Sequence, residues 1–533
     1  MRVAILAVAF LGCHPEGIQQ VRFVNRPAVD VVDDRRDVPT PPKIREPDHD
    51  LYAFRVSLKR PVDDALDVPR HERALGVNAI DEVPDSTWFT NRGDLTADEI
   101  ARGPLTADSP ELHKPWTVVG NKVGSGTLGF LAVDARGTKY MLKLDFPQLS
   151  ELQTGSEAVV DRLLWACGFN VPENEIVYFS VEDLVLSPGG KITREQLQKT
   201  LGAARRMPDG RYRALASRWL DGKPVGPAPT VGVRSDDPND RIPHERRRDL
   251  RGMSVVYAWL DLVDVWPGNF LDMWQTHGDR HYLVHYLLDF NDGLGLFAHR
   301  FHELRISKEY TVDWEAISSG IFSLGIDKQP WETRPIVHVP GVASVFTVED
   351  LDPSDWREAL QYAPFQEADR FDAYWGAKII ARFTRDDIRA AVREGRFSDP
   401  RGIEYLVDTL VGRQRKLVAY WYARVNPLEH FAFGSGLCFD DLAITQGYVA
   451  AGTPTLYVVN VRDAGNRLLA TPMRVQGAAS GHTCVEVPAL AAHRGYTIVD
   501  IATKRAGQSN DSIEVHVGRD ETGAPRVIGI WRP

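Results

Sequence analysis

The chain has 533 residues, of which 43% are hydrophobic and 26% charged, and its formal net charge is −10. This length exceeds what one compact core organises, so we expect about two or three domains. The acidic balance argues against nucleic acid as a partner, because phosphate backbones attract a basic face. Beyond the N-terminus there is no apolar run of about eighteen residues, so the sequence predicts no membrane-spanning helix.

The N-terminal segment MRVAILAVAFLGC is typical of a signal peptide, since one basic residue precedes a short apolar run that ends in Leu11-Gly12-Cys13. Ending on cysteine, it resembles a bacterial lipoprotein signal (residues 1–13), in which Cys13 is lipidated. An ordinary first strand or a misplaced start codon is the alternative. Residues 14–50 are rich in proline and charge and are predicted to be a flexible tether. We therefore expect a protein of the bacterial cell envelope, on the outer-membrane or periplasmic face, that touches the membrane only through a lipid anchor.

The sequence has four cysteines, and they fall into three settings. Cys13 belongs to the expected lipid anchor. Cys167 lies in the helix-like run VVDRLLWACGF, where buried packing is expected. Cys438 and Cys484 share the C-terminal segment, and in an exported protein they form either a disulfide or two free thiols.

Two regions flank the middle of the chain. Residues 51–114 are predicted to be an extension that packs on the core, with VPDSTWFTNR as an ordered loop whose Trp88 and Phe89 fill a neighbouring core. Residues 435–533 contain short β runs, from PTLYVVNV to RVIGIWRP, separated by turns with Gly, Asn and Asp. This pattern is typical of a small all-β sandwich. Its expected role is adhesion or partner docking.

The middle block changes from strand-like to helix-like patterns. WTVVGNKVGSGTLGFLAVDARGTKYMLKLD predicts three strands with a Gly-rich turn, and TGSEAVVDRLLWACG predicts a helix with a glycine stop. PHERRRDLRGMSVVYAWLDLVD predicts one long helix and YLVHYLLDF a buried strand. Amphipathic helices follow from DAYWGAKII onwards. Strands first and helices later favour an α+β fold with two lobes, which we place at residues 115–227 and 228–430.

The first half of this block contains three candidate binding elements. The turn GSGTLGF lies between two strands, so Gly124, Gly126 and Gly129 would let the backbone approach a triphosphate; a plain hairpin turn is the alternative. Lys143 is a lone cation in the apolar strand YMLKLD, and Glu157 opens the helix GSEAVVDRLL. A strand lysine and a helix glutamate at this interval can form an ion pair that orients the lysine onto phosphates.

The second half adds two candidate acidic positions. WLDLVDVWPGNF places Asp264 five residues before Asn269. Such a pair can face a metal–phosphate group, or it can cap a helix and hold a turn. Asp289 ends the apolar strand in YLLDFNDGLG, where a carboxylate would be costly without a cation or hydrogen-bond donors. It could bind Mg²⁺ that bridges the phosphates.

In this order, the five elements resemble the protein-kinase-like superfamily, in its atypical HipA-like, CotH-like and lipid-kinase-like branches, over residues 115 to about 425. The runs SDDPNDRIPHERRRDLRG and VPDSTWF also resemble an uncharacterised family of bacterial lipoproteins. The first resemblance implies a two-lobed kinase-like fold, with the N-terminal extension and the C-terminal β-sandwich-like domain added to it. It also implies that ATP or another nucleotide binds with Mg²⁺.

The same resemblance implies a role for each residue. The glycines and Lys143 would contact the nucleotide phosphates, and Glu157 would pair with Lys143. Asp264 would be the catalytic residue, and Asn269 and Asp289 the metal ligands. ALASRWLDGKPVG would be the hinge between the lobes. The chain departs from the family pattern where Leu-Val-Asp replaces His-Arg-Asp, where asparagine replaces the glycine of Asp-Phe-Gly, and where an Ala-Pro-Glu segment is missing.

Two functions remain open at this stage. One is an atypical kinase that transfers phosphate to a hydroxyl group on an unknown protein or small molecule. The other is a catalytically inactive kinase-like binding or scaffold lipoprotein, because ATP is scarce outside the cytoplasmic membrane. A metal hydrolase is a weaker alternative, since the histidines lack the His-Glu-x-x-His spacing. These histidines are His277, His281, His285, His299 and His302.

Overall fold

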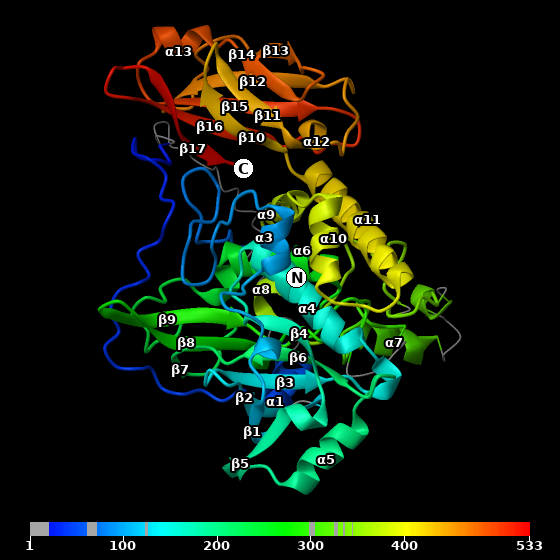
Figure 1. Ribbon diagram of the computed structural model, residues 1–533. Coiled ribbons are helices and arrows are strands. Elements are labelled where there is room, and N and C mark those ends of the chain that lie inside the picture. Colours follow the sequence, from blue (N-terminus) through cyan, green and yellow to red (C-terminus); the bar gives the residue numbers. More distant parts are fainter. Residues whose placement is uncertain are drawn as a thin grey trace, which may run out of the picture. The chain divides into compact units, whose positions relative to one another are not determined.

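The structure is a computed structural model that describes residues 21–60, 72–122, 126–297, 304–323, 329–333, 336–343 and 345–533 (Figure 1). Its contacts divide the chain into two compact units. The smaller unit comprises Met1–Ala28, Ala79–Asp81 and Asn426–Pro533, and the larger unit comprises Val29–Asn78 and Glu82–Val425. Both contain helices and strands, so the chain belongs to the α+β class. Within the described residues, every helix is too short or too polar to cross a membrane.

A six-stranded sheet forms the first part of the larger unit, in the order β4-β6-β3-β2-β1-β5. Its neighbouring strands are antiparallel except for the parallel pair β1 and β5. Burial alternates along β1 and β3, which places Val118 and Leu142 in the core on one face. The three strands predicted from the sequence are present. The strands are β1 (Trp116–Asn121), β2 (Leu128–Val133), β3 (Lys139–Leu144), β4 (Asn174–Phe179), β5 (Leu184–Lys191) and β6 (Tyr212–Arg218).

Two helices accompany this sheet. The first, α4 (Leu152–Cys167), is buried along nearly its whole length and ends at Gly168, whose φ is 117°. Asp145 accepts hydrogen bonds from the first turn of α4, from the Thr154 nitrogen at 3.0 Å and its hydroxyl at 2.7 Å. The second, α5 (Arg194–Ala203), starts with a capping box at Thr193, and we did not predict it from the sequence.

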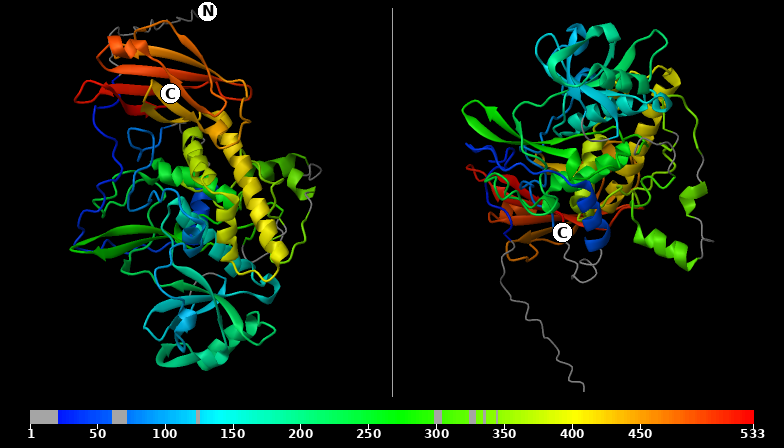
Figure 2. Two further views of the ribbon diagram at one scale, coloured as in Figure 1. Left: turned by 45° about the horizontal axis from the view of Figure 1, so that its top comes forward. Right: turned by 90° about the horizontal axis from the view of Figure 1, so that it is seen from below.

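The remainder of the larger unit is mainly helical. The long helix predicted from Pro243 is instead a short 3-10 turn followed by α6, because Arg247 between them is extended, with ψ of 127°. Figures 1 and 2 show α11 (yellow) beside α10, with which it packs. The helical elements are η5 (His244–Arg246), α6 (Arg248–Leu260), η6 (Pro267–Asn269), α7 (Trp314–Phe322), η7 (Pro330–Thr333), α8 (Ala363–Gln366), α9 (Arg370–Ala381), α10 (Arg385–Arg393) and α11 (Pro400–Arg424).

A small sheet lies in the same unit and contains β7 (Lys223–Pro224), β8 (Phe270–His277) and β9 (Arg280–Leu287). The sequence predicted a buried strand here, and β9 is buried at alternate residues, among them Leu283 and Leu287. The residues between them are partly exposed, so the strand is buried on one face and not on both. Its sheet covers a core on one face only, as antiparallel sheets commonly do.

N-terminal residues from Val29 onwards belong to the larger unit. The flexible tether predicted for residues 14–50 is therefore corrected at its C-terminal end. Asp34 is only 5% exposed and accepts hydrogen bonds from the Thr87 nitrogen at 2.7 Å and hydroxyl at 3.0 Å. These polar contacts fix a segment whose proline and charge content suggested a loose chain. The elements of this region are α1 (His49–Phe54), the π-helix η1 (Arg55–Lys59), α3 (Ala97–Arg102) and η2 (Pro110–Leu112).

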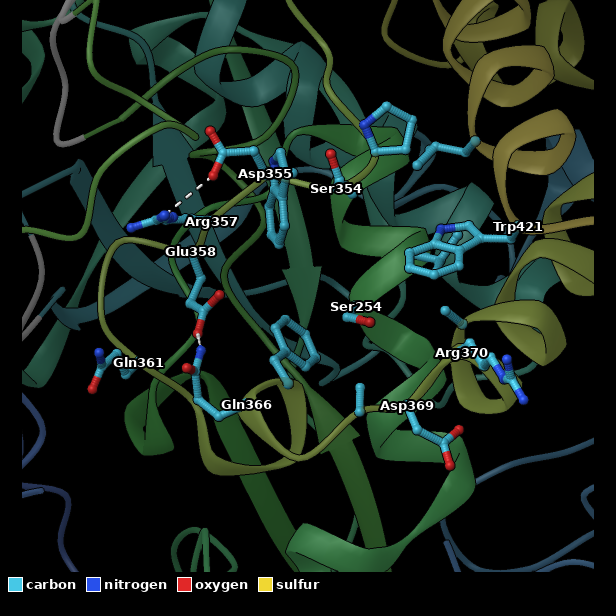
Figure 3. Close-up of a pocket in the computed structure, with 18 of the residues that line it drawn as sticks. Ser254, Ser354, Asp355, Arg357, Glu358, Gln361, Gln366, Asp369, Arg370 and Trp421 are labelled. Atoms are coloured by element: carbon cyan, nitrogen blue, oxygen red, sulfur yellow. Dashed lines mark hydrogen bonds and ion pairs between the residues drawn. The ribbon is translucent and has the colours of Figure 1, made fainter. Parts of the chain in front are cut away.

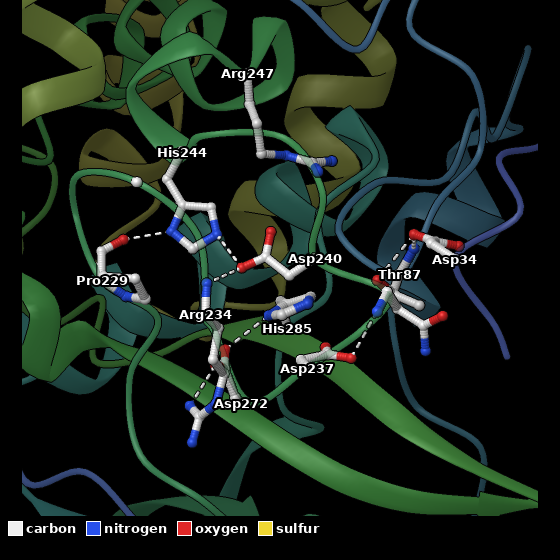
Figure 4. A network of polar contacts seen from close by, with 12 residues as sticks. Asp34, Thr87, Pro229, Arg234, Asp237, Asp240, His244, Arg247, Asp272 and His285 are labelled. Carbon is white, nitrogen blue, oxygen red and sulfur yellow. Dashed lines mark hydrogen bonds and ion pairs between the residues drawn. The ribbon is translucent and has the colours of Figure 1, made fainter. Parts of the chain in front are cut away.

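The loop VPDSTWFTNR is anchored by a network of buried polar groups (Figure 4). The Trp88 ring stacks on His285 with centroids 3.6 Å apart and planes 13° apart. His285 Nδ1 lies 2.7 Å from Asp272, which accepts from Arg234 at 2.9 Å. Asp240, in the SDDPND segment, lies 2.9 Å from His244 Nε2. The Trp88 ring also lies 4.8 Å from the ring of His244, so the loop VPDSTWFTNR and the segment that contains SDDPND meet in one network.

The smaller unit contains a three-stranded sheet, β10-β11-β14, and a five-stranded sheet, β13-β12-β15-β16-β17. Both sheets contribute side chains to one core, which includes Phe439 and Val515. We predicted this region to start at residue 435, but it includes Asn426, whose amide donates to the Ile501 carbonyl at 2.8 Å. Its elements are β10 (Leu428–Phe433), β11 (Leu437–Asp441), α12 (Leu442–Thr445), β12 (Leu456–Asp463), β13 (Met473–Gln476), β14 (His482–Val485), α13 (Pro488–Ala492), β15 (Thr497–Lys504), β16 (Ser512–Arg519) and β17 (Pro525–Trp531).

Candidate functional site

Lys143 joins three elements of the larger unit. The alternation of β3 directs its side chain away from the face that buries Leu142. Its ammonium donates to both carboxylate oxygens of Glu157 on α4, at 2.7 and 2.9 Å, and to Asp289 Oδ1 at 2.7 Å. Burial disfavours the charged lysine, but the two carboxylates outweigh this effect, and the pKa of Lys143 is raised. The lysine is therefore held as a cation between a helix and the loop after β9.

The glycine-rich turn lies beside this lysine. Gly129 pairs directly opposite Lys143 in the register of β2 and β3. A Cβ atom at Gly129 would come within 2.3 Å of the Leu142 carbonyl oxygen, so the close approach of β3 requires glycine there. Gly126 is exposed in the bend before β2, and Gly124 lies outside the described residues.

Lys122 is a second cation at this site that we did not select from the sequence. It directly follows β1, and its backbone nitrogen lies 3.4 Å from the Gly129 carbonyl oxygen. Burial and the nearby charge of Lys143 lower its pKa, while Asp289 and Glu157 oppose that effect. The signal in the sequence was a lysine two residues before the first glycine of the turn, in NKVGSG.

Asp264 and Asn269 form one unit in the loop after α6. The helix ends at Asp261, whose left-handed φ of 52° turns the chain into this loop. The Asn269 amide nitrogen donates to the Asp264 carboxylate at 2.9 Å and to its backbone carbonyl at 2.9 Å. Burial raises the pKa of Asp264, the Asn269 amide lowers it, and the charge of Asp289 raises it again. The balance leaves the pKa of this carboxyl above that of an ordinary aspartate.

Asp289 connects the Lys143–Glu157 pair with the Asp264–Asn269 pair. Its φ is 59°, a left-handed conformation that is uncommon for residues other than glycine and is often found at functional sites. The preceding Leu288 nitrogen donates to the Asn269 carbonyl at 2.8 Å. Further along the same loop, the Gly293 carbonyl accepts from Ser156 on α4 at 2.9 Å. The loop is thus fixed to both the Asp264 segment and the helix that contains Glu157.

Buried contacts hold the segment in which Leu-Val-Asp stands in place of His-Arg-Asp. Leu262 and Val263, which replace His-Arg, are each 1% exposed. Arg413 on α11 donates to the Trp259 carbonyl and to the Asp261 carboxylate, both at 3.0 Å. This arginine holds the end of α6 in place from a distant helix, and nothing in the local sequence pattern indicated it.

The donor set fits Mg²⁺. Magnesium prefers oxygen ligands and is commonly held by one or two carboxylates together with substrate phosphates. Asp289 offers a carboxylate that is 27% exposed. Because the nitrogen of the Asn269 amide is engaged by Asp264, its carbonyl oxygen is the atom with which Asn269 would bind a metal.

An N-terminal helix lies against the Asp264 loop. The His49 ring, at the start of α1, contacts Trp266 edge-to-face with centroids 4.9 Å apart. A cavity of about 690 Å³ borders Pro267 of the same loop. Basic residues outnumber acidic ones in its lining, which includes Arg45, Glu46, Asp48, Arg55, Lys59 and Arg60.

A second cavity, of about 470 Å³, is lined by none of the candidate residues Lys143, Glu157, Asp264, Asn269 and Asp289 (Figure 3). Its polar groups largely pair with one another. Arg357 contacts Asp355 at 3.2 Å, and the Gln366 amide donates to Glu358 at 2.8 Å. Because these groups satisfy one another, the cavity gives little indication of a ligand.

The histidines do not form a hydrolase site in the described part of the chain. His285 is committed to Asp272, and the His281 ring stacks on Trp274 at 4.6 Å. The ring of His277 stacks on Tyr282 at 4.4 Å, while His299 and His302 lie outside the described residues. The one group of three ligand-type side chains found within the described residues lies in the smaller unit and comprises Cys438, His482 and Cys484.

Cys438 and Cys484 lie on neighbouring strands and are joined as a disulfide, with sulfurs 2.07 Å apart. Cys167 is a buried free cysteine within α4, as its apolar surroundings predicted. Cys13 lies outside the described residues.

Comparison with known proteins finds no matching family model and no matching curated protein. Among solved structures, the chain is similar to the Helicobacter pylori proinflammatory kinase CtkA, at 12% identity and a TM-score of 0.30, covering 56% of this chain and 93% of that one. A second match is the MAP kinase LmaMPK10 from Leishmania major, at 11% identity and a TM-score of 0.18, covering 57% and 80%. Both scores are below 0.5, so the case for function depends on the geometry above.

Proposed function

We propose that the larger unit is a two-lobed, atypical kinase-like domain that binds a Mg-nucleotide and transfers its phosphoryl group to a hydroxyl acceptor. The observation that supports this most directly is the contact of Lys143 with both Glu157 and Asp289, next to the Asp264–Asn269 pair. Phosphoryl transfer depends mainly on positioning of the reacting groups and on stabilisation of their charge. A buried lysine between two carboxylates, next to a carboxylate–amide pair, can supply both.

Each residue has a defined task in this proposal. Lys143, oriented by Glu157, would hold nucleotide phosphate oxygens, and Lys122 would add positive charge beside the glycine-rich turn. Mg²⁺, when bound, would neutralise phosphate charge with Asn269 and Asp289 as its ligands. Asp264 would orient the acceptor hydroxyl and accept its proton, a role that its raised pKa favours.

The acceptor would enter through the cavity beside Pro267. That cavity adjoins the loop of Asp264, and α1 forms one of its walls. Its excess of basic residues favours an acceptor that carries negative charge, on either a protein or a small molecule. The wall formed by α1 comes from the N-terminal part of the chain, which would therefore contribute to specificity for the acceptor.

A catalytically inactive binding protein is the second candidate function. It is favoured by the replacement of His-Arg with the buried pair Leu262 and Val263, which removes polar groups from the loop. In that case the same residues would bind a nucleotide without transferring phosphate.

Calorimetric titration with Mg-ATP tests nucleotide binding. We expect heat of binding for the wild type, a loss of at least tenfold in affinity for Asp289→Asn, and no change for Asp279→Asn, whose side chain is 96% exposed in the β8–β9 turn. Absence of binding to the wild type, or equal affinity in all three proteins, would contradict the proposal.

ATP turnover and autophosphorylation then distinguish the two candidates. If the domain is a kinase, Asp264→Asn abolishes turnover while Mg-ATP still binds. If wild type binds Mg-ATP and shows no transfer to itself or to hydroxyl acceptors, the inactive binding protein is the correct reading. Turnover that survives Asp264→Asn undiminished would remove Asp264 from the mechanism.

We also propose that the chain is anchored to the bacterial cell envelope by a lipid on Cys13. In a bacterial host, Cys13→Ser is expected to abolish incorporation of labelled palmitate and to release the protein from the membrane fraction. Unchanged labelling and fractionation would contradict the anchor.

A further inference from the structure

Four side chains of the smaller unit share one face of the sheet β10-β11-β14. In the antiparallel register of β11 and β14, Cys438 pairs with Cys484 and Asp440 pairs with His482. The alternate residues Leu437, Phe439, Thr483 and Val485 are all buried on the opposite face. The two cysteines, the histidine and the aspartate are therefore neighbours on the outward face, where solvent reaches them.

The histidine on this face is already oriented toward the sulfur atoms. His482 Nε2 lies 3.7 Å from Cys484 Sγ. Its other ring nitrogen, Nδ1, lies 2.6 Å from Asp440 Oδ1. The second oxygen of Asp440 lies 2.9 Å from His430 Nδ1. An aspartate that accepts from Nδ1 leaves Nε2 with its lone pair free to bind a metal, which is the usual carboxylate–histidine–metal arrangement.

These separations suit a tetrahedral metal site. The ligand atoms of Cys438, His482 and Cys484 all lie within 4.8 Å of one another. A zinc ion with tetrahedral Zn–N and Zn–S bonds of about 2.0 and 2.3 Å places the nitrogen about 3.5 Å from each sulfur. The observed nitrogen–sulfur distance of 3.7 Å is close to this value. The two sulfurs, joined as a disulfide in the structure, would have to separate to about 3.8 Å.

We propose that Cys438, Cys484 and His482 form a redox-gated site for a thiophilic divalent metal, zinc, in the smaller unit. Oxidised, the cysteines are joined as the disulfide and the site is closed. A dithiol reductant supplies two electrons and two protons, which cleave the S–S bond to two thiols, while the dithiol is oxidised to its own disulfide. Zinc binding then displaces both thiol protons to solvent and forms two Zn–S bonds and one Zn–N bond.

The fourth coordination position is filled by water in this proposal. Asp440 is a positioning residue, because it contacts His482 and not the metal. Since this site shares no residue with the nucleotide site of the larger unit, its test is independent of the proposed kinase activity.

Cobalt is a suitable probe, because a Co²⁺–thiolate site absorbs in the near ultraviolet by sulfur-to-metal charge transfer. The full chain carrying Cys13→Ser is reduced with a trialkylphosphine, which takes oxygen from water as it cleaves the disulfide. Titration with Co²⁺ is expected to give the charge-transfer band with one equivalent bound, and Zn²⁺ is expected to displace it. The unreduced protein is expected to give no band.

Variants identify the ligands. His482→Ala is expected to weaken Co²⁺ binding by at least tenfold, whereas His493→Ala, a histidine of the same unit outside the cluster, leaves it unchanged. Asp440→Asn is expected to weaken binding by about 10–100-fold and Asp440→Glu to restore most of it. Circular dichroism of each variant checks folding. A reduced protein without the band, or equal affinities for His482→Ala and His493→Ala, would overturn the proposal.

Discussion

The side-chain amide of Asn269 donates to the carboxylate of Asp264 at 2.9 Å, and the same nitrogen also reaches the Asp264 backbone carbonyl at 2.9 Å. The two residues are five positions apart, and the 3-10 turn Pro267–Asn269 brings the chain back between them. The amide therefore fixes the carboxylate and at the same time stabilises its charged form. The turn therefore positions the amide that holds the carboxylate of Asp264, the candidate catalytic residue.

Removal of this amide is expected to change the pH dependence of turnover. The pKa of Asp264 is raised by burial, so its base form is lost at a higher pH than for an ordinary aspartate. Asn269→Ala removes a donor that lowers this pKa, and the acidic limb of the rate profile should move to higher pH by about one unit. The measurement is kcat against pH under saturating nucleotide and Mg²⁺. A limb that stays in place, or one that persists in Asp264→Asn, would contradict the assignment.

The Lys143–Glu157 pair is expected to show strong energetic coupling. Lys143→Met leaves Glu157, which is 2% exposed, without its cation, and should lower the free energy of unfolding by about 3–5 kcal/mol. Lys143→Met combined with Glu157→Gln should recover part of this loss. Urea unfolding of the two single variants and the double variant gives the coupling. Strict additivity would show that the ion pair contributes nothing of its own.

Trp88 is expected to be a major anchor of the N-terminal extension. Its ring is 7% exposed and stacks on His285. Trp88→Ala should destabilise the protein by about 3–5 kcal/mol, as for other buried large side chains. Trp219, which is 44% exposed, provides the matched control, and Trp219→Ala should cost about 1 kcal/mol or less. Thermal or urea unfolding compares the two; similar losses would argue against the anchoring role.

Asp240 is expected to contribute stability that is lost in acid. Burial opposes its ionisation, but the hydrogen bond to His244 and the other groups around it outweigh this, so its pKa is lowered in the folded state. Its contribution is therefore present above the unfolded pKa of about 3.9 and is lost as the pH falls through the lower folded value. Asp240→Asn should remove this part of the acid dependence and cost about 1.5–3 kcal/mol near neutral pH. This contribution of Asp240 is tested by measuring the free energy of unfolding from pH 7 down to the acid range. Asp279→Asn is the exposed control.

Local sequence patterns were sufficient for many of the helices and strands. The alternation of apolar residues predicted β1 to β3, and the helical spacing before Gly168 predicted the helix that carries Glu157. These signals are reliable because they report neighbours along the chain, through strand and helix periodicity. The order of a lysine, a glutamate and two acidic segments also indicated which side chains to examine together.

Contacts between distant residues required the tertiary structure. The contact of Asp289 with Lys143, the support of α6 by Arg413 and the stacking of Trp88 on His285 join residues far apart in sequence. Lys122 was recognised as part of the candidate site only from the structure, in which the pairing of β1 with β2 places it beside Gly129. In the same way, pairing of β11 with β14 set Cys438, Cys484, Asp440 and His482 on one face.

The sequence by itself thus determined the α+β class, most of the strands, several of the longer helices, and the chemical types present at the candidate site. Only the tertiary structure decided which of those groups touch, that the segment from Val29 packs rather than tethers, and where the cysteines meet. The physical reason is that periodicity and capping act over a few residues, whereas strand register and the pairing of buried charges are set by packing across the whole unit.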